Sequence, residues 1–203
     1  MNTLQEVTDE IESSRKNNRV AVFKKMFLDV PKWETFIENI NYSSTIESNR
    51  LNTLTDLGSD KIHGSCLISN DFYIQSLHKI SDNIFKEQID LVNFFNDVYG
   101  EKTKGGTAFV NLSKNKKDID VHRDQWDSIF WQCIGTTKWV IKEKGSDVPV
   151  QNIILNPGDV AVIPSGVFHG IKIDGPRASI AYGYRVITQE IDNENRDFYR
   201  ASV

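Results

Sequence analysis

Cysteine is scarce in this sequence. This scarcity excludes one class of fold and indicates the kind of cellular compartment. The 203 residues include two cysteines, Cys66 and Cys133, which lie far apart and form no CxxC pair. A small disulfide-stapled domain needs several paired cysteines, so that class is excluded. We interpret both residues as free, buried thiols in a reducing compartment.

Long apolar runs and an excess of basic residues are also missing. Residues 1–18 are polar and charged, without the apolar centre of a signal peptide, and no run approaches the length that spans a membrane. The net charge is -4 and the pI is near 5.6. Dedicated nucleic-acid binders usually present a basic face, so this balance argues against that class. We expect a cytoplasmic protein without a membrane partner.

The composition that remains is that of an ordinary globular domain. Hydrophobic residues make up 39% and charged residues 26% of the chain, which suffices for one sizeable core. No internal repeat or low-complexity linker divides it. We predict a single domain over 1–203, with a mostly helical part at 1–104, a β-barrel core at 105–187 and a tail at 188–203.

Hydrophobic spacing in the first half favours helices. Residues 3–16 predict a weak polar helix, 19–27 alternates enough for a strand, and 31–40 opens with a proline suited to a helix start. Residues 43–70 are rich in Ser, Asn and Thr, which is typical of loops. Apolar positions within 72–99 recur at helical spacing and predict one long or two short amphipathic helices.

After Gly105-Gly106 the apolar pattern changes to strands. We expect eight strands, at 107–113, 119–124, 128–134, 137–143, 150–155, 159–163, 168–173 and 178–187. Gly, Pro, Asn or Asp stand in the breaks between them, as turns require. Short strands in regular steps predict a sandwich or barrel. The fold class is therefore mainly β with α, a cupin or jelly-roll barrel with an N-terminal helical layer outside it.

Two of the four histidines fall in the barrel half. His122 and Asp124 are two residues apart on one predicted strand, so their side chains share a face. His169 begins the seventh strand, which can neighbour the second in a jelly roll. His63 lies in the loop-like region and His78 on the helical stretch, without ligand-type neighbours at short spacing.

His122, Asp124 and His169 are therefore candidate metal ligands. Two histidines and one carboxylate on one side of a metal leave its other positions open, as in non-haem Fe(II) oxygenases. The same ligands also suit Zn, Mn and Ni, so ligand type alone leaves the metal open. A strand histidine packed in the core without any metal is the alternative.

Motifs throughout the barrel half share one order. They are H-x-D, a glutamine, G-x-x-x-W, L-x-P-G-D, I-P-x-G-x-x-H and a closing G-[FY]-R. The residues in those places are His122, Asp124, Gln132, Gly135, Trp139, Leu155, Pro157, Gly158, Asp159, Ile163, Pro164, Gly166, His169, Gly183, Tyr184 and Arg185. Residues 105–187 thereby resemble the JmjC/cupin-type Fe(II)- and 2-oxoglutarate-dependent oxygenases, with motifs most like those of the ribosomal oxygenases.

The resemblance implies a double-stranded β-helix, Fe(II) held by His122, Asp124 and His169, and 2-oxoglutarate as co-substrate. Hydroxylation of a substrate would accompany conversion of 2-oxoglutarate to succinate and CO2. No catalytic residue beyond the metal ligands is implied. The substrate stays open between a protein, RNA and a small molecule.

The sequence departs from the family at the residue that binds the distal carboxylate of 2-oxoglutarate. The family has Lys or Arg two residues after the glycine of G-x-x-x-W, and this chain has Thr137. Lys138 is displaced by one, and strand alternation predicts that it points out of the barrel. Arg177-Ala-Ser179 resembles the R-x-S motif of many other 2-oxoglutarate oxygenases. Arg177, Ser179, Thr137 and Lys138 are therefore the candidate co-substrate contacts, and we expect Arg177 to matter more than Lys138.

Other interpretations remain beside the oxygenase. The chain could be a metal-binding cupin with other chemistry, an inactive binding module, or a helix–barrel domain without metal. Trp126, Trp131 and Trp139 are expected to pack the barrel, with Trp126 nearest the ligands. Gln132 is expected to be structural.

Overall fold

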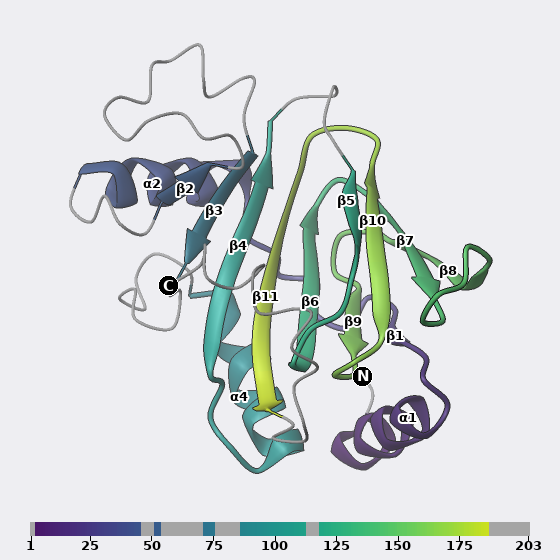
Figure 1. The fold of residues 1–203 in the computed structure, drawn as a ribbon. Helices are drawn as coiled ribbons and strands as arrows, with labels where there is room; N and C mark the ends of the chain where they lie inside the picture. The colour runs from purple at the N-terminus through teal and green to yellow at the C-terminus, as the bar shows by residue number, and fades with distance from the viewer. Residues whose placement is uncertain (1–2, 46–50, 54–70, 76–85, 113–117, 187–203) are drawn as a thin grey trace.

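The computed structural model describes residues 3–45, 51–53, 71–75, 86–112 and 118–186 (Figure 1). The helices are α1 (Leu4–Lys16), α2 (Trp33–Thr45) and α4 (Gln88–Tyr99). The strands are β1 (Ala21–Phe23), β2 (Leu51–Thr53), β3 (Asp71–Gln75), β4 (Gly105–Asn111), β5 (Ile119–His122), β6 (Trp126–Ile134), β7 (Thr137–Lys142), β8 (Pro149–Leu155), β9 (Val160–Ile163), β10 (Phe168–Ile173) and β11 (Arg177–Val186).

The predicted change from helix to strand is confirmed. The eight strands expected in the second half are β4 to β11, each with bounds within two residues of those predicted. All helices of the described residues end by Tyr99. Turn residues and two-residue alternation therefore located the strands correctly.

The prediction of helix throughout 72–99 is wrong in part. Residues 88–99 form α4, but residues 71–75 form β3, which pairs with β4. Phe72 lies opposite Val110 and Ile74 opposite Ala108. Alternating apolar residues in so short a stretch fit either element, and pairing with an available sheet edge decided for the strand.

The loop predicted at 43–70 is also interrupted by regular structure. The helix α2 continues to Thr45, and β2 pairs with β3. The rest of that range lies outside the described residues. The strand predicted at 19–27 is shorter than expected and comprises β1 alone.

The strands form two antiparallel sheets that face each other. The larger has the order β1-β9-β6-β11-β4-β3-β2, and the smaller β5-β10-β7-β8. An apolar cluster between them combines Phe130 and Ile163 of the larger sheet with Trp139, Ile153 and other residues of the smaller. This is the predicted barrel, with three short N-terminal strands added to the edges of one sheet.

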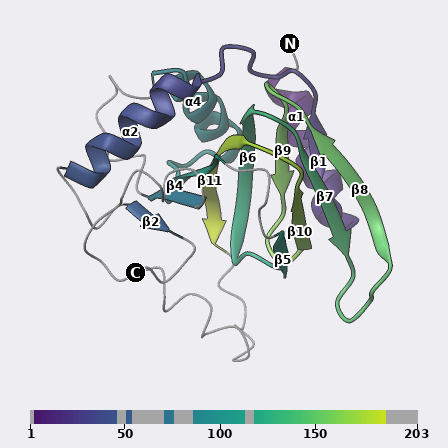
Figure 2. The ribbon, with the colours of Figure 1, turned by 90° about the horizontal axis from the view of Figure 1, so that it is seen from above.

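A second apolar cluster covers the outer face of the larger sheet. It joins Ile11 of α1, Phe36 of α2 and Phe95 of α4 to strand residues such as Trp131. Figure 2 shows α2 and α4 on the side of this sheet away from β5 and β10. The strand β6 is consequently buried on both faces, with Trp131 outside the barrel and Phe130 inside it. The helical layer was thus predicted correctly.

Candidate metal centre

Strand pairing brings the three candidate ligands together. The strands β5 and β10 are antiparallel neighbours, and His122 lies directly opposite His169 in their register. One nitrogen of each histidine and one oxygen of Asp124 lie within 4.8 Å of one another. The Nε2 atoms of His122 and His169 are each 3.9 Å from a different oxygen of the Asp124 carboxylate. Two residues distant in sequence thus face a common carboxylate.

Asp124 lies two residues after the end of β5, and its carboxylate nevertheless faces both histidines. The strand β5 ends at His122, two residues earlier than the prediction of 119–124. The Asp124 carbonyl oxygen accepts a hydrogen bond from Gly166 N at 2.9 Å. The hydroxyl of Ser128 donates to Oδ2 of Asp124 at 2.5 Å. These bonds, rather than strand alternation, aim the carboxylate.

Backbone hydrogen bonds determine which nitrogen each histidine presents. The Nδ1 atom of His122 lies 2.9 Å from the Asp120 carbonyl oxygen, and that of His169 lies 3.0 Å from the Val167 carbonyl oxygen. A carbonyl only accepts, so each Nδ1 donates a proton and each Nε2 is the nitrogen that faces Asp124. Outer hydrogen bonds of this kind are typical of metal-binding histidines.

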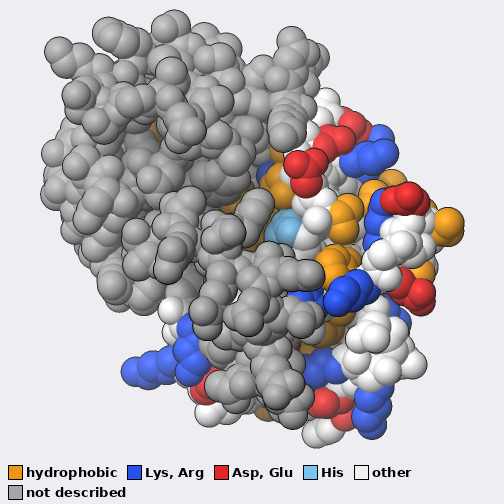
Figure 3. Space-filling model, in the orientation of Figure 1, with side chains coloured by type: hydrophobic (Ala, Val, Ile, Leu, Met, Phe, Trp, Pro, Cys, Tyr) orange, Lys and Arg blue, Asp and Glu red, His pale blue; other side chains and the backbone are white. Residues whose placement is uncertain are grey.

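His169 is the more buried of the two histidines. The side chain of His169 is 4% exposed, and desolvation lowers its pKa below the ordinary value, which favours the neutral form, although the neighbouring Asp124 opposes this. The Trp139 ring stacks on His169 with centroids 5.7 Å apart. The His122 side chain is 29% exposed. Figure 3 shows a histidine side chain at the surface of this face, with apolar and charged side chains beside it.

The donor set fits a divalent metal. Two imidazole nitrogens and a carboxylate suit Fe(II), as well as Zn, Mn and Ni. His63, His78 and Cys66 lie outside the described residues, whereas Cys133 is a buried free thiol whose pKa is raised by burial.

Lys138 lies outside the barrel. Its side chain is 53% exposed and its Nζ is 2.5 Å from Asp174 Oδ2. This agrees with the alternation of β7, which buries Thr137, Trp139 and Ile141. Lys138 therefore does not join the interior side chains.

Thr137 and Ser179 meet at the side chain of Gln132. Their hydroxyls donate to the same oxygen, Gln132 Oε1, at 2.9 and 3.0 Å. Thr137 Oγ1 also accepts a hydrogen bond from Trp139 Nε1 at 3.0 Å. The amide nitrogen of Gln132 donates to the Ile134 carbonyl at 2.7 Å. Gln132 thus holds three buried strands together, in keeping with the structural role expected for it.

Arg177 is buried deeper in the same interior. It is 1% exposed, and its Nε donates to Asn111 Oδ1 at 2.5 Å. Asn111 is its direct partner on β4. Gly135 permits this packing, because a Cβ there would lie 2.4 Å from the Pro176 carbonyl oxygen and 3.3 Å from Arg177 Cα. Steric constraints therefore explain why the G-x-x-x-W motif has glycine at position 135.

The candidate contacts to 2-oxoglutarate lie at different distances along β11 from the level of the metal ligands. Gly183 pairs with Ser128, which holds Asp124. Arg177 and Gly183 are six positions apart, roughly 20 Å along a strand at 3.3 Å per residue. Ser179 lies two residues closer, and its alternation places it on the same face.

Sequence reasoning did not single out Ser128 or Asp127 for the site. Both stand in the stretch Asp124-Gln-Trp-Asp127-Ser128, so their nearness to Asp124 was the available signal. It also missed the contact of Arg123 with the Phe168 ring, at 5.5 Å from guanidinium to centroid. Trp126 is half-buried and contacts Gly183, where a Cβ would lie 3.1 Å from its ring.

Two facing antiparallel sheets with outer helices define a cupin-type double-stranded β-helix. The chain is similar in structure to Escherichia coli YcfD, with a TM-score of 0.63 and 17% identity over 84% of this chain and 50% of that one. It is similar to the same ribosomal oxygenase in complex with cobalt and 2-oxoglutarate, with a TM-score of 0.60 and 19% identity. That comparison covers 84% of this chain and 49% of that one.

This chain therefore spans about half the length of the YcfD structures. At such low identity the likeness shows the fold. No family model matches the sequence, and no curated protein matches it. Among the helices of the described ranges, none has the length and hydropathy to cross a bilayer.

Proposed function

We propose that this protein is an Fe(II)- and 2-oxoglutarate-dependent oxygenase that hydroxylates an as yet unidentified substrate. The observation that carries the proposal is the pair of Nε2 atoms, each fixed by a backbone bond at Nδ1 and each 3.9 Å from Asp124. This two-histidine, one-carboxylate set on a cupin-type barrel is the ligand set of such enzymes. YcfD, which shares the fold, has been solved with cobalt and 2-oxoglutarate.

His122, Asp124 and His169 would hold the metal on one side. Bound Fe(II) would supply activation of dioxygen, coupled to conversion of 2-oxoglutarate to succinate and CO2. The chain's own part is orientation and exclusion of water. Trp139 and Phe130, with centroids 4.6 Å apart, fill the apolar interior next to His169 and shield it from solvent.

We infer that the distal carboxylate of 2-oxoglutarate points to the layer of Thr137, Ser179 and Gln132. Two hydroxyl protons already converge there on one oxygen, and a carboxylate oxygen could accept the same two bonds. Arg177 lies one interior position further along β11 and would supply positive charge behind them. Lys138, on the outer face, takes no part.

The test is succinate release from 2-oxoglutarate by purified protein with Fe(II), compared with His169→Ala. We expect release from the wild type and none above background from the variant. Metal binding without turnover of 2-oxoglutarate would favour the alternative, a metal-binding cupin with other chemistry or an inactive binding module. Absence of metal binding would leave a structural domain. A mass-shift screen against cell lysate would then identify the substrate as protein, RNA or small molecule.

A buried free thiol at Cys133 suits a reducing compartment, and we propose that the protein is cytoplasmic. We also propose that the helical part and the barrel form one domain, because Phe36 and Phe95 share a core cluster with β6.

A further inference from the structure

A buried carboxylate lies three residues after the aspartate of the candidate metal centre. Asp127 is 1% exposed and lies on the outer face of β6, as the second residue of that strand. Its Oδ2 accepts hydrogen bonds from Arg15 Nε at 3.0 Å and from the Tyr99 hydroxyl at 3.1 Å. Its Oδ1 accepts one from Ser165 N at 2.8 Å. Burying an ionised carboxylate is costly unless it is paired and hydrogen-bonded, as it is here.

The hydrogen bond from Ser165 to Asp127 is important because Ser165 lies in the turn that also forms hydrogen bonds with Asp124 and His169. The turn between β9 and β10 donates Gly166 N to the Asp124 carbonyl at 2.9 Å, and the Ser165 hydroxyl approaches that oxygen at 3.4 Å. One residue later, the Val167 carbonyl accepts from His169 Nδ1 at 3.0 Å. A shift of this turn would therefore move two of the three candidate ligands.

Ser128, next in sequence, acts from the other side of the sheet. Neighbouring residues of a strand point to opposite faces, so Asp127 lies outside the barrel and Ser128 inside it. The Ser128 hydroxyl donates directly to Asp124 Oδ2 at 2.5 Å. The dipeptide thus secures Asp124 twice, through its carboxylate and through the turn that holds its backbone.

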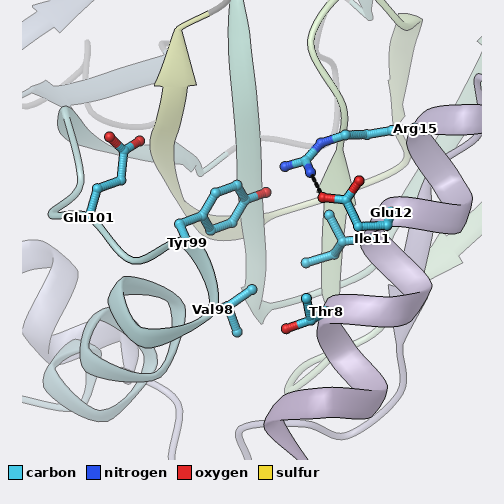
Figure 4. Close-up of a pocket in the computed structure, with 7 residues that line it drawn as sticks. All are labelled: Thr8, Ile11, Glu12, Arg15, Val98, Tyr99 and Glu101. Carbon is cyan, nitrogen blue, oxygen red and sulfur yellow. Dashed lines mark hydrogen bonds and ion pairs between the residues drawn. The ribbon is translucent and has the colours of Figure 1, made fainter.

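Helices from the first half of the chain complete the network. Arg15 comes from the last turn of α1, where it also pairs with Glu12, and Tyr99 is the last residue of α4. Figure 4 shows Arg15 and Tyr99 approaching each other from these two elements, beside a cavity that they line. The Tyr99 ring stacks on Tyr184 with centroids 4.8 Å apart. The barrel end that carries the ligands is thereby tied to the helical layer.

We propose that Asp127 is a positioning residue of the metal centre, and that Arg15 and Tyr99 hold it in place. It acts through Ser165 on the turn that orients Asp124 and His169, without touching the metal. This inference rests on the proposed function, since it requires that the triad binds a metal. It assigns the helices a role in the site as well as in the core.

The test measures cobalt(II) affinity of the full-length protein by calorimetry and visible absorption. Asp127→Asn keeps the size of the side chain but removes its charge. Loss of an outer-shell partner typically lowers metal affinity about 10- to 100-fold, and we expect a decrease in that range. Arg15→Gln leaves the barrel sequence intact and should lower the affinity less, which provides a second measurement if Asp127→Asn does not fold.

The matched control is Asp159→Asn. Asp159 is also buried and also accepts backbone hydrogen bonds, from Lys25 and Asn156, next to the other end of β9. We expect it to lower stability while leaving cobalt affinity unchanged. The proposal is overturned if both Asp127→Asn and Arg15→Gln bind cobalt like the wild type, or if Asp159→Asn weakens binding equally. A wild type that binds no cobalt would instead refute the proposed function itself.

Discussion

At the scale of single residues, the direction of each polar side chain distinguishes the candidate site residues from residues on the outer surface. His122 and His169 turn their Nε2 atoms to one carboxylate, whereas Lys138 turns outward to Asp174. Each direction follows from a nearby backbone bond or from strand alternation.

Replacing any one of His122, Asp124 or His169 by alanine should abolish stoichiometric iron binding and leave the fold intact. Loss of an outer-shell partner alone costs about 10- to 100-fold in affinity, so loss of a ligand should cost more. Metal content of purified protein and circular dichroism test this. His63→Ala and His78→Ala serve as controls that should keep their iron. Full iron occupancy in His169→Ala would place the site elsewhere.

Arg177→Ala should weaken 2-oxoglutarate binding far more than Lys138→Ala, by about 10-fold or more, because the variant removes the positive charge behind Thr137 and Ser179. Arg177 lies in the interior, whereas Lys138 lies on the surface. Calorimetry on metal-loaded protein measures both affinities, and Thr137→Val tests the smaller contribution of a hydroxyl. If Arg177→Ala binds 2-oxoglutarate as tightly as the wild type, the guanidinium has a structural role alone.

At the scale of elements, short turns determine where strands begin and end. The turn before β9 contains Gly158, whose φ of +90° favours glycine, and a Cβ there would lie 3.1 Å from the Phe27 carbonyl oxygen. Asp159 follows and accepts hydrogen bonds from Lys25 N, Asn156 N and Lys24 Nζ, each at 2.9 Å. The segment after β1 is thereby fastened to the barrel.

Asp159→Asn should lower the free energy of unfolding at pH 7 by about 1.5 to 3 kcal/mol, the usual range for hydrogen bonds to a charged group. Burial alone would raise the pKa of Asp159, but the bonds from Lys24, Asn156 and Lys25 outweigh it and lower that pKa. The unfolded chain therefore binds the proton more tightly than the native one. This stabilisation is present above the unfolded pKa near 4 and is lost as pH falls through the native value.

Urea denaturation between pH 3 and 7, about the range in which an aspartate titrates, measures this dependence. The variant should lose less stability on acidification than the wild type does. Equal slopes for the two proteins would show that Asp159 does not contribute to the acid sensitivity.

At the scale of the whole molecule, two apolar clusters share the larger sheet. One fills the barrel and the other joins the outer face of that sheet to the helices. Phe95 of α4 is fully buried in the outer cluster, whereas Ile37 of α2 is 46% exposed. The helical layer is therefore part of the core.

Phe95→Ala should lower the free energy of unfolding by about 3 to 5 kcal/mol, the typical cost of truncating a buried phenylalanine. Ile37→Ala, an exposed apolar residue of the same layer, should change it by less than about 0.5 kcal/mol. Thermal and urea denaturation compare the two. A small effect of Phe95→Ala would mean that the barrel is stable without its helical cover.

The sequence by itself determined the eight strands of the barrel, because alternation and turn chemistry are local properties. His122, Asp124 and His169 were proposed as ligands from their residue types and from the order of the motifs, and the structure brings the three side chains close together. Only the tertiary structure decided that residues 71–75 form a strand, because a strand there requires the edge of β4 as its hydrogen-bonding partner.

Tertiary structure also decided that Asp127 would reach Arg15, 112 residues away, and that His122 would lie opposite His169. Both contacts depend on the register between strands and on how helices pack against a sheet. Such register is set by many side chains together, so no short stretch of sequence contains it.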